Sequence, residues 1–253
     1  MLEEVQPRVI LHTQALSDVD RCEREPQVAQ RLNVDTTATL VEALDHHQRR
    51  KGQGPPPWLI SVSTDYVFAG TKGAAYDETD VPDPISEYGR SKWRGEQAAL
   101  RYPRAVVART STLFGPGRMN FCDHIVERLR AGQSVEAFID QVTSPTLTTD
   151  LAAALGALSA ALESWPPRGE SWPRVVHLSN AGWCTRLSFA QRVAALIGGN
   201  PDLIRPIRMA DQHRDAPRPP QVGLATKHVP QLIGRMLRSW QDALDAYLRQ
   251  RPS

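Results

Sequence analysis

The sequence has few cysteines and no arrangement of residues that is typical of a metal site. Its three cysteines, Cys22, Cys122 and Cys184, lie far apart in 253 residues and form no C-x-x-C pair. A disulfide framework is therefore not expected, and we predict reduced thiols in mostly structural positions. No H-E-x-x-H segment occurs, and the adjacent His46 and His47 cannot share a helix face. We therefore predict no metal centre.

Long hydrophobic runs and clustered basic residues are also lacking. No stretch approaches the roughly 18 consecutive apolar residues of a membrane span, and the first residues, MLEEVQPR, lack the basic-then-apolar order of a signal peptide. The 30 basic and 28 acidic side chains are interspersed, for a net charge of +2. With 41% hydrophobic residues, the chain is typical of one large globular domain or two small ones. We expect a cytoplasmic protein that binds neither membrane nor nucleic acid.

Short apolar runs alternate with segments of helical periodicity. The runs typical of buried strands are RVIL (8–11), LISVS (59–63), AVVAR (105–109), VEAFI (135–139) and VVHLS (175–179). Helices are predicted over 33–47, 87–100, 120–130, 149–164 and 187–198, with Asn33 as the N-cap of the first. A last helix places Trp240, Leu244 and Tyr247 on one apolar stripe. This alternation predicts an α/β fold, a doubly wound parallel sheet with helices on both faces.

Polar residues stand where the predicted sheet would bind a ligand. Ligands of parallel sheets bind beyond the carboxyl ends of the strands, and STDYVF (63–68) follows the run LISVS at that end. Further along, EYGRSK (87–92) places Tyr88 and Lys92 four residues apart, on one face of a helix. A nearby ammonium lowers the pKa of a phenol, and Thr64 could orient a carbonyl oxygen beside it. The alternative is an ordinary surface pair worth a few tenths of a kcal/mol.

Several segments, in a fixed order, carry a resemblance to one family. They are DVDRCE (18–23), NVDTT (33–37), the run 63–96, RTSTLFG (109–115), NF (120–121), DQVTSPTLTTDLA (140–152), HLSNAG (177–182) and RPPQVGL (218–224). With them the chain resembles the extended short-chain dehydrogenase/reductases and, within these, the dTDP-4-dehydrorhamnose reductases. The resemblance implies a Rossmann-like fold and the reduction of a nucleotide-linked 4-keto-6-deoxysugar by NADPH or NADH. By best analogy the substrate is dTDP-4-dehydro-L-rhamnose and the product dTDP-L-rhamnose.

The resemblance also implies roles for single residues. Thr64, Tyr88 and Lys92 would be the catalytic triad, in which Tyr88 gives a proton to the ketone oxygen while the nicotinamide supplies hydride. The residues that would line the cofactor are Ser63, Asp65, Tyr88, Lys92 and Arg109. Those that would approach the dTDP-sugar are Asn120, Gln141, Pro145 and Arg218, where a guanidinium suits a pyrophosphate. From the residues alone, Asn120 could be only a helix cap and Pro145 only a turn.

One part of the family pattern is missing. The family opens with a strand, a G-x-x-G-x-x-G turn and a helix that binds the cofactor pyrophosphate, and none of the 16 glycines forms such a turn. We therefore expect a partial dinucleotide-binding domain from 1–112 and 146–182, and a smaller sugar-nucleotide region from 113–145 and 183–253. The strand 8–11 would then be an edge with which another chain could pair.

Several alternatives stay open. A mis-set start, a true loss of tight cofactor binding, or a second copy or partner chain that completes the sheet would each explain the missing turn. The residue that separates NAD from NADP is missing with it. A non-catalytic regulatory or sugar-nucleotide-binding protein, like the methionine adenosyltransferase β subunit, is the second functional hypothesis, and an epimerase or dehydratase of a nucleotide sugar is the third. The intact proton-transfer residues favour a reductase, whereas the missing turn favours a binding protein.

Overall fold

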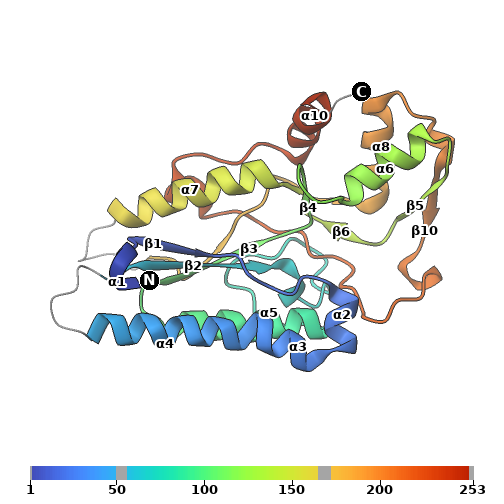
Figure 1. Cartoon of the computed structure of the whole chain (residues 1–253). Coiled ribbons are helices and arrows are strands. Elements are labelled where there is room, and N and C mark those ends of the chain that lie inside the picture. The colour runs from blue at the N-terminus through green and yellow to red at the C-terminus, as the bar shows by residue number, and fades with distance from the viewer. Residues whose placement is uncertain (1, 50–55, 165–171, 251–253) are drawn as a thin grey trace.

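The computed structural model describes residues 2–49, 56–164 and 172–250, and it is built around a parallel sheet between two layers of helices (Figure 1). The sheet has the strand order β1-β2-β3-β8 and all its pairings are parallel. Its strands are β1 (Val9–His12), β2 (Trp58–Thr64), β3 (Ala105–Thr110) and β8 (Val175–His177). The predicted α/β fold is confirmed, and four of the five predicted strands belong to this sheet. β2 and β3 are the two central strands, so the carboxyl end of β2 lies between the neighbouring strands β1 and β3.

Helices cover both faces of the sheet. Figure 1 shows α7 (Thr148–Ser164) on one face and α4 (Thr36–Arg49) and α5 (Glu87–Leu100) on the other. Side chains alternate between the faces, as the pleat of a strand requires. Leu59 and Val107 pack with the buried residues of α4 and α5, whereas Ile60 and Val106 pack with those of α7. A sheet buried on both sides explains why its strands read as continuous apolar runs.

The fifth predicted strand lies outside this sheet. β5 (Val135–Phe138) pairs in parallel with β10 (Ile204–Ile207), which makes a separate two-stranded sheet. The sequence predicted a strand over 135–139 but not its partner, because an apolar run predicts a strand without identifying the strand with which it pairs. Two further short pairs join β4 (Leu113–Phe114) to β7 (Thr146–Leu147) and β6 (Val142–Thr143) to β9 (Cys184–Thr185).

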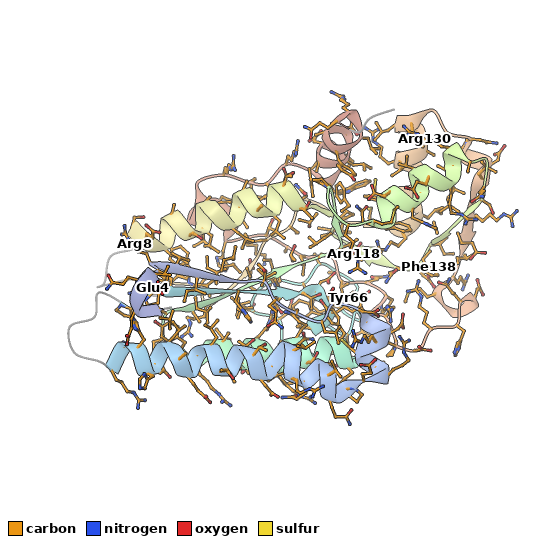
Figure 2. All side chains as sticks on the ribbon, in the orientation of Figure 1. Glu4, Arg8, Tyr66, Arg118, Arg130 and Phe138 are labelled. Atoms are coloured by element: carbon orange, nitrogen blue, oxygen red, sulfur yellow. The ribbon has the colours of Figure 1, made fainter. Side chains whose placement is uncertain are left out.

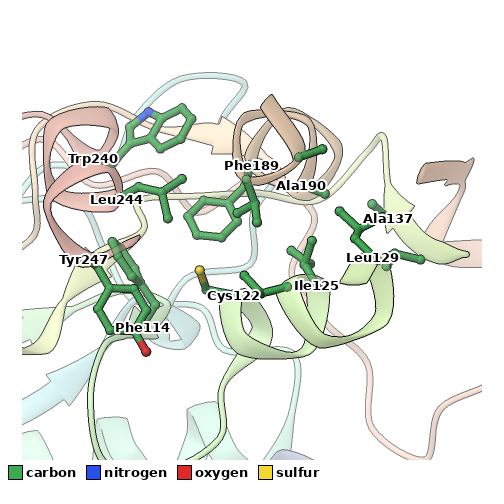
Figure 3. Packing of buried hydrophobic residues seen from close by; sticks show 14 of the residues in the cluster. Phe114, Cys122, Ile125, Leu129, Ala137, Phe189, Ala190, Trp240, Leu244 and Tyr247 are labelled. Atoms are coloured by element: carbon green, nitrogen blue, oxygen red, sulfur yellow. The ribbon is translucent and has the colours of Figure 1, made fainter. Parts of the chain in front are cut away.

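A second hydrophobic core lies away from the sheet (Figure 3). It is formed mainly by α6 (Phe121–Arg130), α8 (Arg186–Ile197) and α10 (Trp240–Gln250), with β5 at its side. The predicted stripe of Trp240, Leu244 and Tyr247 is buried in it. By contrast, α9 (Val229–Ile233) packs on the α7 side of the main sheet. The proposed domain boundaries stay a prediction.

The first predicted helix begins earlier than expected. It starts at Pro26 with α3 (Pro26–Gln30) and continues through a π-helical turn, Arg31–Asp35, into α4. Asn33 is therefore not an N-cap. Its buried side chain accepts from the Leu16 backbone N–H (2.7 Å) and donates to Ser91 Oγ (2.9 Å). Proline is favoured in the first turn of a helix, and here it outweighs the capping preference of asparagine.

The remaining α-helices of the described residues are α1 (Leu2–Val5) and α2 (Val19–Arg24), and two more 3-10 turns span Pro201–Leu203 and Met209–Asp211. The cysteines Cys22 and Cys184 are free thiols, and Cys122 is buried. Within the three described ranges, no three His, Cys, Asp or Glu side chains are grouped so that they could hold a metal ion. The helices of those ranges are also too short or too polar for any of them to cross a membrane.

His177, at the end of β8, makes stability depend on pH. It is completely buried, its Nδ1 bonds the Ala225 carbonyl (3.0 Å), and burial together with Arg109 lowers its pKa to about 3. Below pH 6.5 the unfolded chain takes up a proton that the folded protein excludes, so stability falls as pH decreases from 6.5 toward 3. We expect this residue alone to cost about 2 kcal/mol between pH 7.5 and pH 5.

Urea unfolding of the wild type and His177→Gln at both pH values measures this cost. The variant should lose about 2 kcal/mol less on acidification than the wild type. An equal loss in the two proteins would show that His177 does not contribute.

Candidate active site

Thr64 stands at the junction of β2 and a short helical turn. β2 ends at Thr64, and Asp65–Val67 forms a 3-10 turn whose first free N–H is capped by the threonine side chain: Tyr66 N donates to Thr64 Oγ1 (3.2 Å). The strand and the cap together bury Thr64 at the carboxyl end of the sheet. The sequence prediction placed the polar run STDYVF at this position, and the structure agrees.

Helix α5 brings Tyr88 to the same place. Ser86 caps this helix by accepting from Gly89 N (3.2 Å), so that Tyr88 lies in the first turn. Gly89 is packed so closely that a Cβ atom there would come within 2.2 Å of the Tyr66 carbonyl oxygen. Because glycine permits this approach, the Tyr88 ring meets the Tyr66 ring edge to face, with centroids 5.6 Å apart, and the Tyr88 hydroxyl lies near Thr64.

Lys92 completes the group one helical turn later. Its Nζ donates to the Val62 carbonyl of β2 (2.8 Å), and the side chain is buried. The alternative of an ordinary surface pair is therefore wrong, because a surface lysine would be hydrated. Burial lowers the pKa of Lys92 to about 8. The structure brings Thr64, Tyr88 and Lys92 together at the carboxyl end of β2, and their catalytic roles stay a prediction.

The pKa of Tyr88 differs from the sequence expectation. Lys92 was predicted to lower it, whereas burial raises the pKa of the phenol above its ordinary value, and the nearby Asp65 carboxylate also raises it. Desolvation disfavours a phenolate more than the nearby Thr64 hydroxyl favours it. Tyr88 is consequently a neutral phenol at physiological pH, a state in which it can donate a proton.

Asp65 lies immediately beside this group and is fully buried. It accepts hydrogen bonds from Thr64 Oγ1 (3.0 Å) and from Ser111 Oγ, which follows β3. Burial raises its pKa to about 6, against the opposing effect of these two hydrogen bonds.

The guanidinium of Arg109 is engaged in an ion pair. It forms a buried bidentate pair with Glu96 of α5, with Nε–Oε1 and Nη2–Oε2 distances of 2.9 and 2.7 Å. By contrast, the Ser63 hydroxyl is buried at the end of β2, and within the described part of the chain no side chain or backbone group bonds it. Cofactor contacts by Ser63, Asp65 and Arg109 stay predictions.

A cationic cavity of about 550 Å³ opens beside Tyr66. Figure 2 labels two of its lining residues, Tyr66 near the end of the sheet and Phe138 of β5. Its basic walls come from Arg128, Arg186, Arg214 and Arg218, and Gln141 also lines it. The volume lies within the roughly 300–1,000 Å³ of small-molecule sites.

Stacking and an ion pair hold three of these arginines. Arg186 lies over the Phe121 ring (4.9 Å) and Arg214 over the Phe138 ring (4.6 Å). Arg218 is paired with Asp20, at Nη2–Oδ2 2.7 Å, which joins the segments RPPQVGL and DVDRCE. The planar guanidinium groups are thereby fixed around the cavity, an arrangement suited to an anion.

The cavity contains some of the predicted substrate residues and adds others. Gln141 and Arg218 line it, whereas Asn120 and Pro145 are not among its lining residues. Asn120 caps α6 by accepting from Cys122 N (3.0 Å) and Asp123 N (3.3 Å), and Pro145 is buried. Substrate contact by these four residues stays a prediction.

Arg128, Arg186 and Arg214 were missed by the sequence prediction. Arg214 lies in the Arg-rich loop 213–224, which is visible in the sequence. Arg128 and Arg186 lie on helices, and a single arginine in a helical segment does not indicate from the sequence that it lines a cavity.

Comparison with known proteins gives consistent matches over nearly the whole chain. The family model described as "RmlD substrate binding domain" matches residues 1–252. A dTDP-4-dehydrorhamnose reductase of Mycobacterium tuberculosis is 36% identical over 242 residues, which are 93% of this chain and 74% of the relative. A probable dTDP-4,6-dihydroxy-2-methyloxan-3-one 4-ketoreductase of Streptomyces antibioticus is 34% identical, over 96% of this chain and 78% of the relative.

Solved structures agree with these matches. A dTDP-4-dehydrorhamnose reductase of Bacillus anthracis, in complex with NADP, superposes with a TM-score of 0.85 at 25% identity, over 99% of this chain and 83% of that one. A dTDP-glucose 4,6-dehydratase of the same organism superposes with a TM-score of 0.76 at 19% identity, which indicates a shared fold.

Proposed function

Because the chain belongs to the RmlD substrate binding domain family, we propose that it is an NAD(P)H-dependent reductase of a nucleotide-linked 4-keto-6-deoxysugar. The proposed reaction converts dTDP-4-dehydro-L-rhamnose to dTDP-L-rhamnose. The observation that carries it is the convergence of Thr64, Tyr88 and Lys92 beside a cationic cavity of small-molecule size.

The residues of the described chain fit one end of the cofactor. The buried, unpartnered hydroxyl of Ser63 and the ammonium of Lys92 lie at the carboxyl end of β2, where a polar nicotinamide ribose would find hydrogen-bond partners. When bound, the nicotinamide supplies the hydride for the ketone carbon. No residue of this sequence is assigned to the cofactor pyrophosphate. We favour NADP(H), because the Bacillus anthracis reductase is in complex with NADP.

Tyr88 provides the proton in the proposed reaction. Its phenol stays protonated at neutral pH because burial raises its pKa, and a ketone oxygen near Oη would accept its proton. Gly89 and Ser86 position the first turn of α5, and so the phenol, against β2. Lys92 is held on the same helix face by the Val62 carbonyl.

The cavity suits the nucleoside diphosphate part of the proposed substrate. A nucleoside diphosphate carries oxygens that match the planar donors of a guanidinium, and four arginines surround this space. The ion pair with Asp20 holds the Arg218 side chain in place, so this side chain loses less conformational freedom when an anion binds.

The direct test is a reductase assay. Purified protein is incubated with NADPH and dTDP-4-dehydro-L-rhamnose, and both nicotinamide absorbance and the formation of dTDP-L-rhamnose are followed. Arg218→Ala should raise KM for the sugar nucleotide about tenfold with a smaller change in kcat, because a group that binds diphosphate acts on ground and transition states alike. Absence of product with every nucleotide 4-ketosugar tried would reject the proposal.

A binding protein that lacks catalysis is the second candidate. The glycine turn that the family uses for the cofactor pyrophosphate is missing from the sequence. Calorimetric titration with NADPH separates the two functions, since weak binding together with tight binding of the dTDP-sugar would favour this candidate. We further propose a cytoplasmic location, in keeping with the free thiols of Cys22 and Cys184, and a second copy or partner chain paired with the edge strand β1.

A further inference from the structure

One carboxylate lines the otherwise cationic cavity. Among the described residues around this space, four are arginines and Glu136 is the single acid. Glu136 is exposed on β5, and no ion pair or hydrogen bond joins its carboxylate to any described group, its strand neighbour Arg205 included. A carboxylate near bound phosphates repels them. It therefore lowers the affinity for an anion unless the ligand also gives it a hydrogen bond.

The pleat of β5 places Glu136 on the cavity side of the strand. Val135 and Ala137 are buried in the second core. Glu136 and Phe138, on the opposite face of the strand, line the cavity. Ile207 of β10, which pairs with Phe138, lines it as well. This end of the cavity thus combines an apolar surface with a carboxylate that has no partner among the described residues.

Arg128 of α6 lies at the same end. Its Nε donates to the carbonyl of Ser134 (2.8 Å), two residues before Glu136, and its two Nη groups have no acceptor among the described residues. Donors beside an acceptor match the edge of a heterocycle in which a ring N–H adjoins a carbonyl oxygen. The diphosphate of a sugar nucleotide has no hydrogen to give at neutral pH. Arg128 and Glu136 together therefore suit a base rather than a phosphate.

The arrangement of the lining residues gives the proposed substrate one direction. Tyr66 lines the cavity, and its ring meets that of Tyr88 at the carboxyl end of the main sheet. The keto sugar must reach Tyr88, so it occupies the Tyr66 end. Figure 1 shows β5 and β10 outside the main sheet, beyond its carboxyl end. In a sugar nucleotide the base is the part farthest from the sugar, and Glu136 on β5 is placed to meet it.

We propose that Glu136 is a specificity-determining residue that accepts a hydrogen bond from N3–H of the thymine of the bound sugar nucleotide. This inference rests on the proposed function, which supplies the diphosphate and the sugar. N3–H is the one N–H group of a dTDP-4-ketosugar, and its other donors are hydroxyls. A hydrogen bond to an ionised acceptor is stronger than a neutral one, so it offsets the repulsion between Glu136 and the diphosphate.

Calorimetric titration of the full chain with dTDP and with N3-methyl-dTDP tests the proposal. The methyl group replaces the N3 hydrogen, so the wild type should bind the analogue about tenfold more weakly, the scale for one hydrogen bond to a charged group. In Glu136→Ala the two affinities should lie within about threefold, because the acceptor is gone. Equal affinities in the wild type, or an unchanged ratio in Glu136→Ala, would overturn the proposal.

Glu127→Ala is the matched control. Glu127 is an exposed acid of α6 that does not line the cavity, so its removal changes the net charge equally and should leave the ratio at about tenfold. Inorganic pyrophosphate reports on the arginines alone. Glu136→Ala should bind it at least as tightly as the wild type, because a repulsive charge is removed. Weaker binding would contradict the repulsion on which the proposal depends.

A third nucleotide separates the base from the deoxyribose. If Glu136 accepted from the 3′-hydroxyl, 3′-deoxy-dTDP would lose affinity for the wild type but not for Glu136→Ala, and the proposal would be wrong. We expect 3′-deoxy-dTDP to follow dTDP in both proteins. If the preference for N3–H depends on Glu136 but no reductase activity is found, the proposed function fails and the role of Glu136 stands. Product formation together with equal affinities for dTDP and N3-methyl-dTDP would overturn the role of Glu136 alone.

Discussion

Tyr88→Phe is expected to lower kcat of the reductase reaction about a thousandfold, the usual scale for loss of a positioned general acid. The variant loses one oxygen atom, the phenol oxygen near Thr64 that gives the proton in the proposed reaction. KM for the dTDP-sugar should remain within about threefold, since the arginines of the cavity are untouched. Steady-state kinetics with NADPH measures both quantities.

Tyr66→Phe is the matched control. It removes the same atom from a ring whose centroid is 5.6 Å from that of Tyr88, so the packing change is comparable. Because Tyr66 lines the cavity, a modest rise in KM is expected, with kcat within about tenfold of the wild type. If Tyr88→Phe kept more than a tenth of the wild-type kcat, Tyr88 could not be the acid.

The helix that carries the candidate acid was predictable to the residue, whereas the electrostatics of its side chains were not. The predicted limits 87–100 coincide with those of α5, whose beginning is set by a local signal, the capping Ser86. The pKa of Tyr88 depends on burial by segments far away in the sequence, and burial raised the pKa that Lys92 was expected to lower.

Long-range pairing explains the other differences. The residues 135–138 predict a strand by their own composition, but the partner strand β10 lies some 70 residues later. No sequence pattern in either strand identifies the other as its partner. Arg186 and Arg214 likewise reach the cavity only through the packing of α8 and the loop after β10. The family resemblance supplied Gln141 and Arg218, because their segments are motifs, and supplied nothing for arginines outside such segments.

Glu96→Ala is expected to lower the free energy of unfolding by about 3–5 kcal/mol, the scale for breaking a buried ion pair. Glu96 and Arg109 are 2% and 3% exposed, and their bidentate contact crosses from α5 to β3. Removing the carboxylate leaves a buried guanidinium without a counter-charge. Replacing both residues, as in Glu96→Leu with Arg109→Met, should restore most of the loss, because the cost arises from the unpaired charge.

Glu87→Ala on the same helix separates this effect from a general loss of acidic charge. Glu87 pairs with Arg90 and Arg94, whose side chains are 37% and 48% exposed, so its removal should cost less than about 1 kcal/mol. Urea unfolding of the three variants gives the comparison, and equal losses for Glu87→Ala and Glu96→Ala would contradict it. Helix α5 also carries Tyr88 and Lys92. If the buried pair fixes the position of α5 against the sheet, the double variant Glu96→Leu with Arg109→Met should fold well and still show a lower kcat.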